Sequence, residues 1–190
     1  MSEAYQPHLE VLPPPQLALW PELSGLPPHL VLYGGTAIAL RLGGRQSVDF
    51  DFFSSQPLDA DSLRDSFGWL AHAMLVQAAP NTATFVVDRG GPVKVSFFGG
   101  LTFGRVDSPT PATGHGMKTS SLLDLAAQKV KVVQVRAEQK DYLDIARLMR
   151  QGITIPTMLG AARSLYPEFA PAPTLKALCY FGDGDLVSLP

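Results

Sequence analysis

Hydrophobic and polar residues alternate along residues 47–53, which read Ser-Val-Asp-Phe-Asp-Phe-Phe. Alternation with a period of two is typical of a β-strand that buries one of its faces. Upstream, the apolar run 31–33 is followed by Gly34 and Gly35 and then by the largely apolar segment 36–42, which ends at two further glycines. This order predicts a strand, a tight turn, a helix of two turns that ends at a glycine, and a second strand.

The rest of the chain predicts one hairpin and several helices. Two β-rich runs, 82–88 and 93–98, flank a Gly-Gly-Pro loop and predict a hairpin. The segment 99–119 is rich in Gly, Thr and Pro, so we expect an irregular connection there. Helical patterns limited by Pro and Gly predict helices at 16–23, 58–69, 121–136, 140–149, 156–166 and 174–180. We therefore expect an α+β protein, with an α/β core and a lead-in helix over residues 1–119 and a helical C-terminal lobe over residues 120–190.

The composition of the 190-residue chain is that of a folded domain, with 46% hydrophobic and 17% charged residues. The formal net charge is −2, so no overall positive charge draws the protein to nucleic acid or to anionic membranes. The single cysteine, Cys179, excludes an intramolecular disulfide and a cysteine-rich zinc site. The first residues lack the features of a secretory signal and no stretch is long enough for a membrane helix, so we expect a cytoplasmic protein without membrane partners.

Two carboxylates stand out in the alternating segment. Residues i and i+2 of a strand point to the same face, so Asp49 and Asp51 project together while Val48, Phe50 and Phe52 project to the other face. Such a pair repels itself unless a cation neutralises it, and oxygen ligands at this spacing suit Mg²⁺ or Mn²⁺ bound together with substrate phosphates. The alternative is that the two aspartates are only the solvated face of an edge strand.

The glycine turn upstream adds an anion site to this picture. Gly34, Gly35 and Thr36 place backbone N–H groups at the start of a helix, where the helix dipole attracts phosphate. Because the helix is short, the chain returns at once to the strand that carries the aspartates, which predicts neighbouring phosphate and metal sites. Arg45 and Ser47 are candidates for further phosphate contacts. The alternatives are glycines that only permit a tight turn, and an ordinary surface arginine and turn-forming serine.

Two runs of residues resemble a known family. The first holds Gly34-Gly35-Thr36-Ala37, Arg41-Leu42-Gly43 and the segment 45–53 with its two aspartates. The second holds Leu125-Ala126-Ala127-Gln128-Lys129, Arg136 and the segment 140–145, Lys-Asp-Tyr-Leu-Asp-Ile. Together they resemble the motifs of the DNA polymerase beta-like nucleotidyltransferases and, more narrowly, of the AbiEii/AbiGii abortive-infection toxins, over roughly residues 30–150.

The resemblance implies a nucleotidyltransferase-like mixed β-sheet flanked by helices. It also implies Mg²⁺-dependent (or Mn²⁺-dependent) transfer of a nucleotide from an NTP, in a bacterial toxin–antitoxin or phage-defence system with an antitoxin protein as a candidate partner. The resemblance further implies that Asp49 and Asp51 are catalytic residues, because they are the metal ligands.

The second motif contributes four candidate site residues. Lys129 lies within the apolar stripe of its predicted helix, so it contacts either the triphosphate or the edge of the core as a snorkelling side chain. The spacing of Lys140, Asp141 and Asp144 is that of ordinary ion pairs on a helix surface. Only the resemblance implies that Lys140 contacts the nucleotide and that both aspartates are candidate catalytic residues.

One position departs from the family pattern. Many nucleotidyltransferases carry a third acidic residue on a later strand, whereas the strand at 93–98 has Lys94, Ser96 and Phe98 on one face, with Ser96 where the third carboxylate is expected. Asp141 and Asp144 are then the alternative bases. The sequence therefore leaves three hypotheses open: an enzyme whose acceptor is an RNA end, a protein hydroxyl or a small molecule; a nucleotide-binding protein without turnover; and a partner-regulated protein that uses residues 153–190 as an interaction surface.

Overall fold

The computed structural model describes residues 4–188, which form two compact units. The first unit comprises the residues up to Thr102 together with Pro109–Ser120, and the second comprises Phe103–Ser108 together with the residues from Ser121 onward. None of the helices over the described range is long and apolar enough to cross a membrane.

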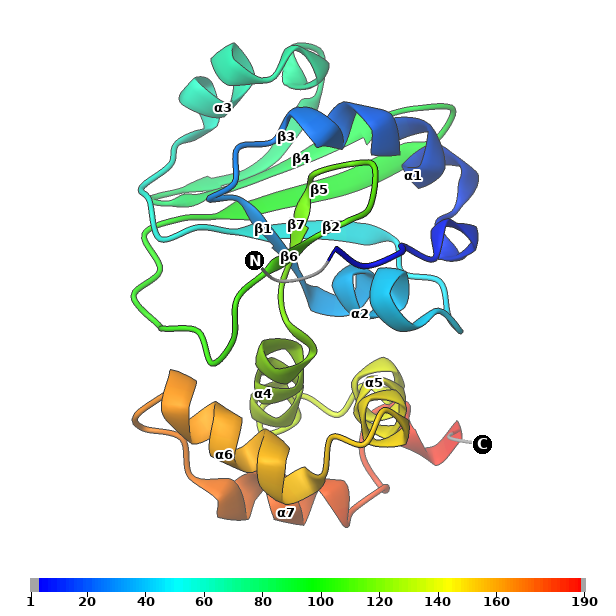
Figure 1. The fold of residues 1–190 in the computed structure, drawn as a ribbon, viewed down its shortest axis with the longest axis vertical. Helices are drawn as coiled ribbons and strands as arrows, with labels where there is room; N and C mark the ends of the chain where they lie inside the picture. The colour runs from blue at the N-terminus through cyan, green and yellow to red at the C-terminus, as the bar shows by residue number, and fades with distance from the viewer. Residues whose placement is uncertain (1–3, 189–190) are drawn as a thin grey trace. The chain divides into compact units, whose positions relative to one another are not determined.

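A mixed β-sheet forms the centre of the first unit (Figure 1). Within the described residues it has seven strands in the order β3-β4-β5-β2-β1-β7-β6. Strand β2 runs antiparallel to β1 and parallel to β5, and β1 runs parallel to β7. The predicted α+β class with a mixed sheet is confirmed. The strands are β1 (Val31–Tyr33), β2 (Asp49–Phe53), β3 (Met74–Ala79), β4 (Thr82–Asp88), β5 (Pro92–Phe98), β6 (Thr110–Pro111) and β7 (Lys118–Thr119).

Aromatic side chains fill one face of the sheet. Phe50 and Phe52 of β2 and Phe97 of β5 are fully buried, and the rings of Phe52 and Phe97 stack with centroids 5.6 Å apart. From the segment that follows β2, the rings of Phe67 and Trp69 each lie 6.4 Å from the ring of Phe97. Because side chains alternate along a strand, burying this face presents Asp49 and Asp51 on the other.

Short helices surround the sheet in the first unit. The predicted helix at 16–23 begins at Pro14 and becomes a 3-10 helix at Trp20, because Pro21 has no N–H for an α-helical bond. The predicted helix at 58–69 ends earlier, at Ser66, and a 3-10 turn follows from Gly68. The helices are η1 (Leu9–Val11), α1 (Pro14–Leu19), η2 (Trp20–Gly25), α2 (Gly34–Leu42), α3 (Ala60–Ser66) and η3 (Gly68–Leu70).

Three strands lie where the sequence predicts none. Strand β3 is at the edge of the sheet and mostly exposed, and its Leu75/Gln77 irregularity breaks the alternation that identifies strands. Strands β6 and β7 have two residues each and lie within the segment that we expected to be irregular. Strands β3 and β6 form by pairing with the strands that follow them, β4 and β7, and β7 also pairs with the distant β1, so pairing rather than an alternating pattern defines these strands.

The second unit is helical. It contains α4 (Leu122–Val132), α5 (Gln139–Arg150), α6 (Ile155–Leu165), α7 (Pro171–Leu178) and η4 (Leu186–Ser188), and α4 packs against both α5 and α6. The Ser121 hydroxyl caps α4 by accepting from Asp124 N, and the Asp124 carboxylate accepts from Val106 N and Asp107 N. These bonds tie the segment Phe103–Ser108 to the start of α4. The predicted helix at 121–136 ends at Val132, four residues early.

We expect Phe97→Ala to lower the free energy of unfolding by about 3–5 kcal/mol, because the substitution leaves a cavity among four aromatic rings. Urea unfolding followed by circular dichroism measures the change. The control is Val48→Ala, whose side chain is 63% exposed and whose loss should cost less than about 0.5 kcal/mol. A cost below about 1 kcal/mol for Phe97→Ala would contradict the packing described for this face.

Candidate functional site

Asp49 and Asp51 project from the same face of β2. Both are half-buried, whereas Phe50 and Phe52 between and after them are fully buried on the opposite face. The same-face geometry predicted from the alternation is therefore confirmed. The roles of the two carboxylates as metal ligands stay a prediction.

The turn at Gly34 and Gly35 opens toward these aspartates. Gly34 has a φ of +74°, and a Cβ at this position would lie 2.9 Å from Asp51 Oδ2. A Cβ at Gly35 would lie 2.5 Å from Arg45 Nη2 and 3.0 Å from Ser47 Oγ. The positive φ of Gly34 favours glycine there, and the absence of side chains at both positions lets the start of α2 approach Asp51, Arg45 and Ser47 closely.

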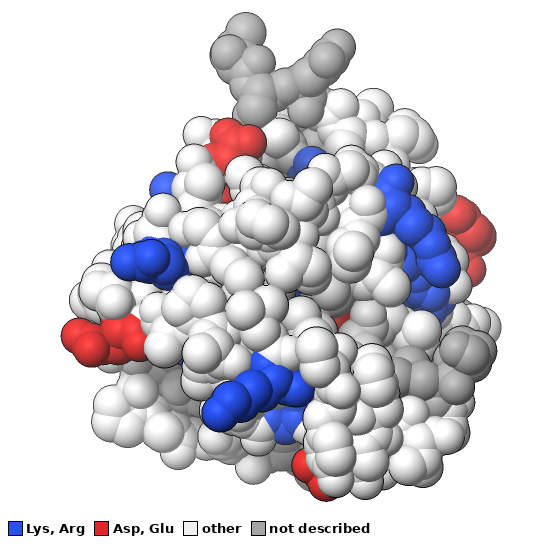
Figure 2. Space-filling view, turned by 90° about the horizontal axis from the view of Figure 1, so that it is seen from below, with Lys and Arg blue, Asp and Glu red and all other residues white. Residues whose placement is uncertain are grey.

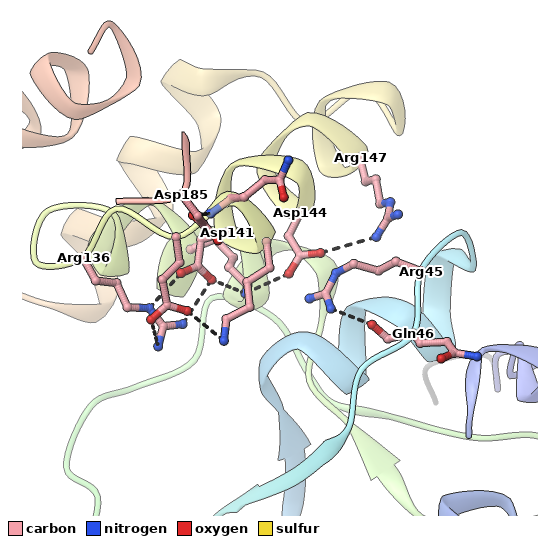
Figure 3. Close-up of polar contacts among 11 residues, drawn as sticks. Arg45, Gln46, Arg136, Asp141, Asp144, Arg147 and Asp185 are labelled. Atoms are coloured by element: carbon pink, nitrogen blue, oxygen red, sulfur yellow. Dashed lines mark hydrogen bonds and ion pairs between the residues drawn. The ribbon is translucent and has the colours of Figure 1, made fainter. Parts of the chain in front are cut away.

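Two side chains of this cluster have structural partners. The Thr36 hydroxyl is buried and donates to Asp49 O, which fastens the first turn of α2 to β2. The contribution of Thr36 to a phosphate site therefore rests on its backbone N–H. Arg45 Nη1 donates to Gln46 O at 2.9 Å (Figure 3). The first unit thus brings together Gly34, Gly35, Thr36, Arg45, Ser47, Asp49 and Asp51.

The neighbouring strand β5 adds a lysine and a serine to the same face. In the parallel pairing of β2 with β5, Asp49 is opposite Lys94 and Asp51 is opposite Ser96. Lys94 Nζ lies 3.3 Å from Asp49 Oδ2. Ser96 is 3% exposed and its Oγ accepts a hydrogen bond of 3.3 Å from Thr84 Oγ1. We did not predict Lys94 as a site residue, although the alternation that points Ser96 toward the aspartates also identifies Lys94.

The donor set of this cluster determines which kind of metal site it fits. Within residues 4–188, no three His, Cys, Asp or Glu side chains are grouped so that they could hold a metal ion between them. Two carboxylates beside a glycine turn fit Mg²⁺ or Mn²⁺, which bind through one or two carboxylates and complete their coordination with substrate phosphates and water. A closed cage made only of protein ligands, as in a structural zinc site, does not fit.

A second charged cluster lies in the helical unit. Lys129 Nζ contacts Asp141 Oδ1 at 2.6 Å and Asp144 Oδ2 at 2.8 Å, and both carboxylates are fully buried. Arg136 Nε donates to Asp141 Oδ2 at 2.8 Å, and Arg147 Nη1 lies 3.6 Å from Asp144 Oδ1 (Figure 3). Burial by itself raises the pKa of Asp141, but Arg136 and Lys129 outweigh burial and hold the pKa below its usual value.

The predicted residues of the second motif therefore have different environments. Lys129, Asp141 and Asp144 pair with one another inside the helical unit, whereas the Lys140 side chain is 54% exposed and lies 2.7 Å from Glu138 Oε2. These four residues belong to one compact unit, and the glycine turn with Asp49 and Asp51 belongs to the other. Arg136 also contacts Asp141, although the sequence indicated Arg136 only as part of the family motif and not as a site residue.

We expect Asp141→Asn to lower the free energy of unfolding at pH 7 by about 3 kcal/mol, because it leaves Lys129 and Arg136 with less negative charge in a buried site. The lowered pKa of Asp141 means that its contribution is complete above its unfolded pKa, near 4, and is lost as the pH falls through the folded value.

Urea unfolding of both proteins between pH 7 and pH 3 tests this expectation. The difference between the wild type and Asp141→Asn should be constant above about pH 5 and shrink below about pH 4. Asp65→Asn, at an exposed position of α3, is the control and should change stability little at any pH. A difference that grows as the pH falls would contradict the assigned direction.

The family described as "Nucleotidyl transferase AbiEii toxin, Type IV TA system" matches residues 18–178 of the chain. An uncharacterized protein of Aquifex aeolicus is 28% identical over 155 residues, which are 80% of this chain and 73% of that protein. Among solved structures, MenT4, a nucleotidyltransferase toxin of Mycobacterium tuberculosis, is similar with a TM-score of 0.54 at 16% identity, over 75% of this chain and 60% of MenT4. That likeness shows a shared fold. The family match, which spans most of the chain and includes the glycine turn, both aspartates and the buried ion-pair cluster, establishes that the chain belongs to the AbiEii nucleotidyl transferase toxin family.

Proposed function

We propose that the protein transfers a nucleotide from an NTP to an acceptor hydroxyl, with Asp49 and Asp51 as ligands of a divalent metal. One observation carries the proposal: the carboxylates of Asp49 and Asp51 share one face of β2, and the glycine turn that starts α2 lies against Asp51. A helix start binds phosphate and a pair of carboxylates binds a metal ion, so their adjacency suits a metal-bound triphosphate.

Each part of the cluster has a distinct task in this proposal. The backbone N–H groups of Gly34, Gly35 and Thr36 bind phosphate oxygens, and Arg45 and Ser47 contact the same phosphates from the segment before β2. Asp49 and Asp51 would hold Mg²⁺ or Mn²⁺, which would supply positive charge against the triphosphate. The glycines keep the phosphates close to the two carboxylates, so positioning and electrostatics provide most of the catalysis.

The transfer itself is a displacement at phosphorus. The acceptor oxygen attacks the α-phosphorus, the bond from this phosphorus to the oxygen shared with the β-phosphate breaks, and pyrophosphate leaves. The proton of the acceptor hydroxyl passes to a base. Asp141 and Asp144 are the candidate catalytic carboxylates for this step. The ion pairs that lower the pKa of Asp141 make it a weak base. Both carboxylates contact Lys129, and this geometry favours a role for each in holding that lysine.

Lys129 and Lys140 are the proposed nucleotide contacts of the helical unit. The Lys129 side chain is 8% exposed and already faces two carboxylates, so a phosphate has to compete with them. Lys140 is more accessible and loses only an exposed ion pair with Glu138 when it turns to a phosphate.

Ser96 favours a second candidate function, nucleotide binding without turnover. It lies opposite Asp51 on β5, where a third carboxylate would serve the acceptor hydroxyl, and its own hydroxyl is neutral and hydrogen-bonded to Thr84. A serine there provides a ligand without charge and no strong base. Pyrophosphate release separates the enzyme from the binding protein.

The family points to a toxin of a toxin–antitoxin system, so we propose an antitoxin partner and action in the bacterial cytoplasm. On the face in Figure 2, Lys and Arg form separate groups on a surface that is mostly uncharged. The net charge of −2 favours an acceptor other than a long nucleic acid. An RNA end, a protein hydroxyl and a small molecule all offer the hydroxyl that the reaction requires.

We expect Asp49→Asn and Asp51→Asn each to abolish metal-dependent nucleotide transfer, with a loss of at least about 100-fold, because each removes a charged metal ligand. The assay incubates the protein with each labelled NTP, Mg²⁺ or Mn²⁺ and a bacterial extract, and follows labelled acceptor and released pyrophosphate. Both variants should keep the wild-type circular dichroism spectrum. Asp65→Asn is the matched control, and unchanged transfer in the two site variants would remove the basis of the proposal.

We expect Ser96→Asp to strengthen Mn²⁺ binding by about tenfold, because a third carboxylate joins Asp49 and Asp51 on one face. In the absence of metal the same variant should unfold at a lower temperature, because the new charge is buried beside Asp51. Ser96→Asn has nearly the same shape without the charge and is the control. Equal Mn²⁺ affinity of the Asp and Asn variants would show that Ser96 is not at the position of a third ligand.

A further inference from the structure

Lys94 places a positive charge on the face of the sheet that carries Asp49 and Asp51. The parallel register of β2 and β5 places it opposite Asp49, and its Nζ lies 3.3 Å from Asp49 Oδ2. Lys94 is not part of the buried core, because its side chain is 48% exposed. The side chain of its partner Asp49 is 35% exposed. Position and charge, rather than packing, are therefore what this residue contributes.

The ion pair has little influence on the stability of the fold. Exposed pairs between lysine and aspartate add at most about 1 kcal/mol, since water already solvates both groups. Such a pair also breaks easily, because the lysine stem has several rotatable bonds and the ammonium keeps its water on the exposed side. Lys94 can therefore leave Asp49 without disturbing β2 or β5.

A divalent ion that takes Asp49 as a ligand has to compete with this ammonium. The positive charge of Lys94 offsets one of the two negative charges of the aspartate pair, so the lysine weakens the attraction of this pair for a free metal ion. A metal that arrives with a triphosphate changes the balance, because the phosphates bring about four negative charges and offer Lys94 a new partner. The glycine turn beside Asp51 is the place where we propose these phosphates bind.

We propose that Lys94 makes the aspartate pair select a metal–nucleotide complex over a free divalent ion. Lys94 opposes the free ion by pairing with Asp49, and it favours the complex by turning from Asp49 to a phosphate. This inference rests on the proposed function and adds to it a specificity residue on β5. Its consequence is that metal and nucleotide bind together rather than one after the other.

The test compares Mn²⁺ alone with Mn²⁺ plus a non-hydrolysable analogue of each NTP. Free and bound Mn²⁺ are measured by electron paramagnetic resonance, and binding of the analogue is measured by calorimetry at saturating Mn²⁺. Lys94→Met should bind free Mn²⁺ about threefold to tenfold more tightly than the wild type, because the competing charge is gone. The same variant should bind the Mn²⁺–analogue complex about threefold to tenfold more weakly.

Two further variants separate charge at this position from other effects. Lys94→Arg keeps the charge and should preserve the wild-type ratio of the two affinities within about threefold. Lys176→Met makes the same change in net charge at an exposed position of α7 and should leave both affinities unchanged.

The outcomes distinguish this inference from the proposed function. If the wild type binds the Mn²⁺–analogue complex but Lys94→Met shifts both affinities in the same direction, or neither, Lys94 is only a surface ion pair and the inference is overturned while the proposed function stands. If the wild type binds no Mn²⁺–analogue complex for any of the four bases, the proposed function fails and the inference fails with it.

Discussion

The parallel pairing of β2 with β5 is the constraint on which the candidate site depends. It fixes a register in which Asp49 faces Lys94 and Asp51 faces Ser96, so a slip of one residue would replace these neighbours by apolar side chains. The register itself is held from the other face, where Phe52 stacks on the ring of Phe97 in an interior that excludes water. A well-packed aromatic face thus determines which polar groups meet on the opposite face. Mutations in that core should therefore alter the site as well as stability.

The candidate site also requires that the start of helix α2 lies close to Asp51 on β2, and the glycines at the start of α2 permit this close approach. Gly34 adopts a positive φ with Asp51 Oδ2 so close that a Cβ would collide with it, and the buried Thr36 hydroxyl fastens the same turn to Asp49 O. The start of α2 is consequently held close to the Asp51 carboxylate. Groups of opposite polarity held in this way attract a metal-bound anion more strongly than flexible groups do, because little order is lost on binding.

Part of this arrangement could be predicted from the sequence and part could not. The alternation around Asp49 and Asp51, the glycine turn and the α+β class follow local patterns, and local patterns were enough to predict them. The edge strand β3 was not predicted, because it is exposed and irregular and exists through its pairing with β4. The contact between Lys94 and Asp49 has a different cause. Alternation along 93–98 places Lys94 on the same face as Ser96, but only the strand order β5-β2 brings Lys94 next to Asp49, which is far away in the chain. Spacing on α5 suggested surface ion pairs for Asp141 and Asp144, whereas the structure buries both carboxylates around Lys129.

The two acidic clusters differ in burial, and this difference separates their chemistry. Asp141 and Asp144 are fully buried and surrounded by Lys129, Arg136 and Arg147, so removing these cations would leave charges without water or partner. Such carboxylates cannot exchange their partner for a metal ion at low cost. Asp49 is half-buried and its partner Lys94 is nearly half exposed, so its ion pair can open and another cation can take its place. A site that must bind and release a charged substrate needs exchangeable partners of this kind, whereas a site that holds a helix pair together needs permanent ones. The geometry therefore favours β2 as the source of the metal ligands and α5 as the support that orders Lys129.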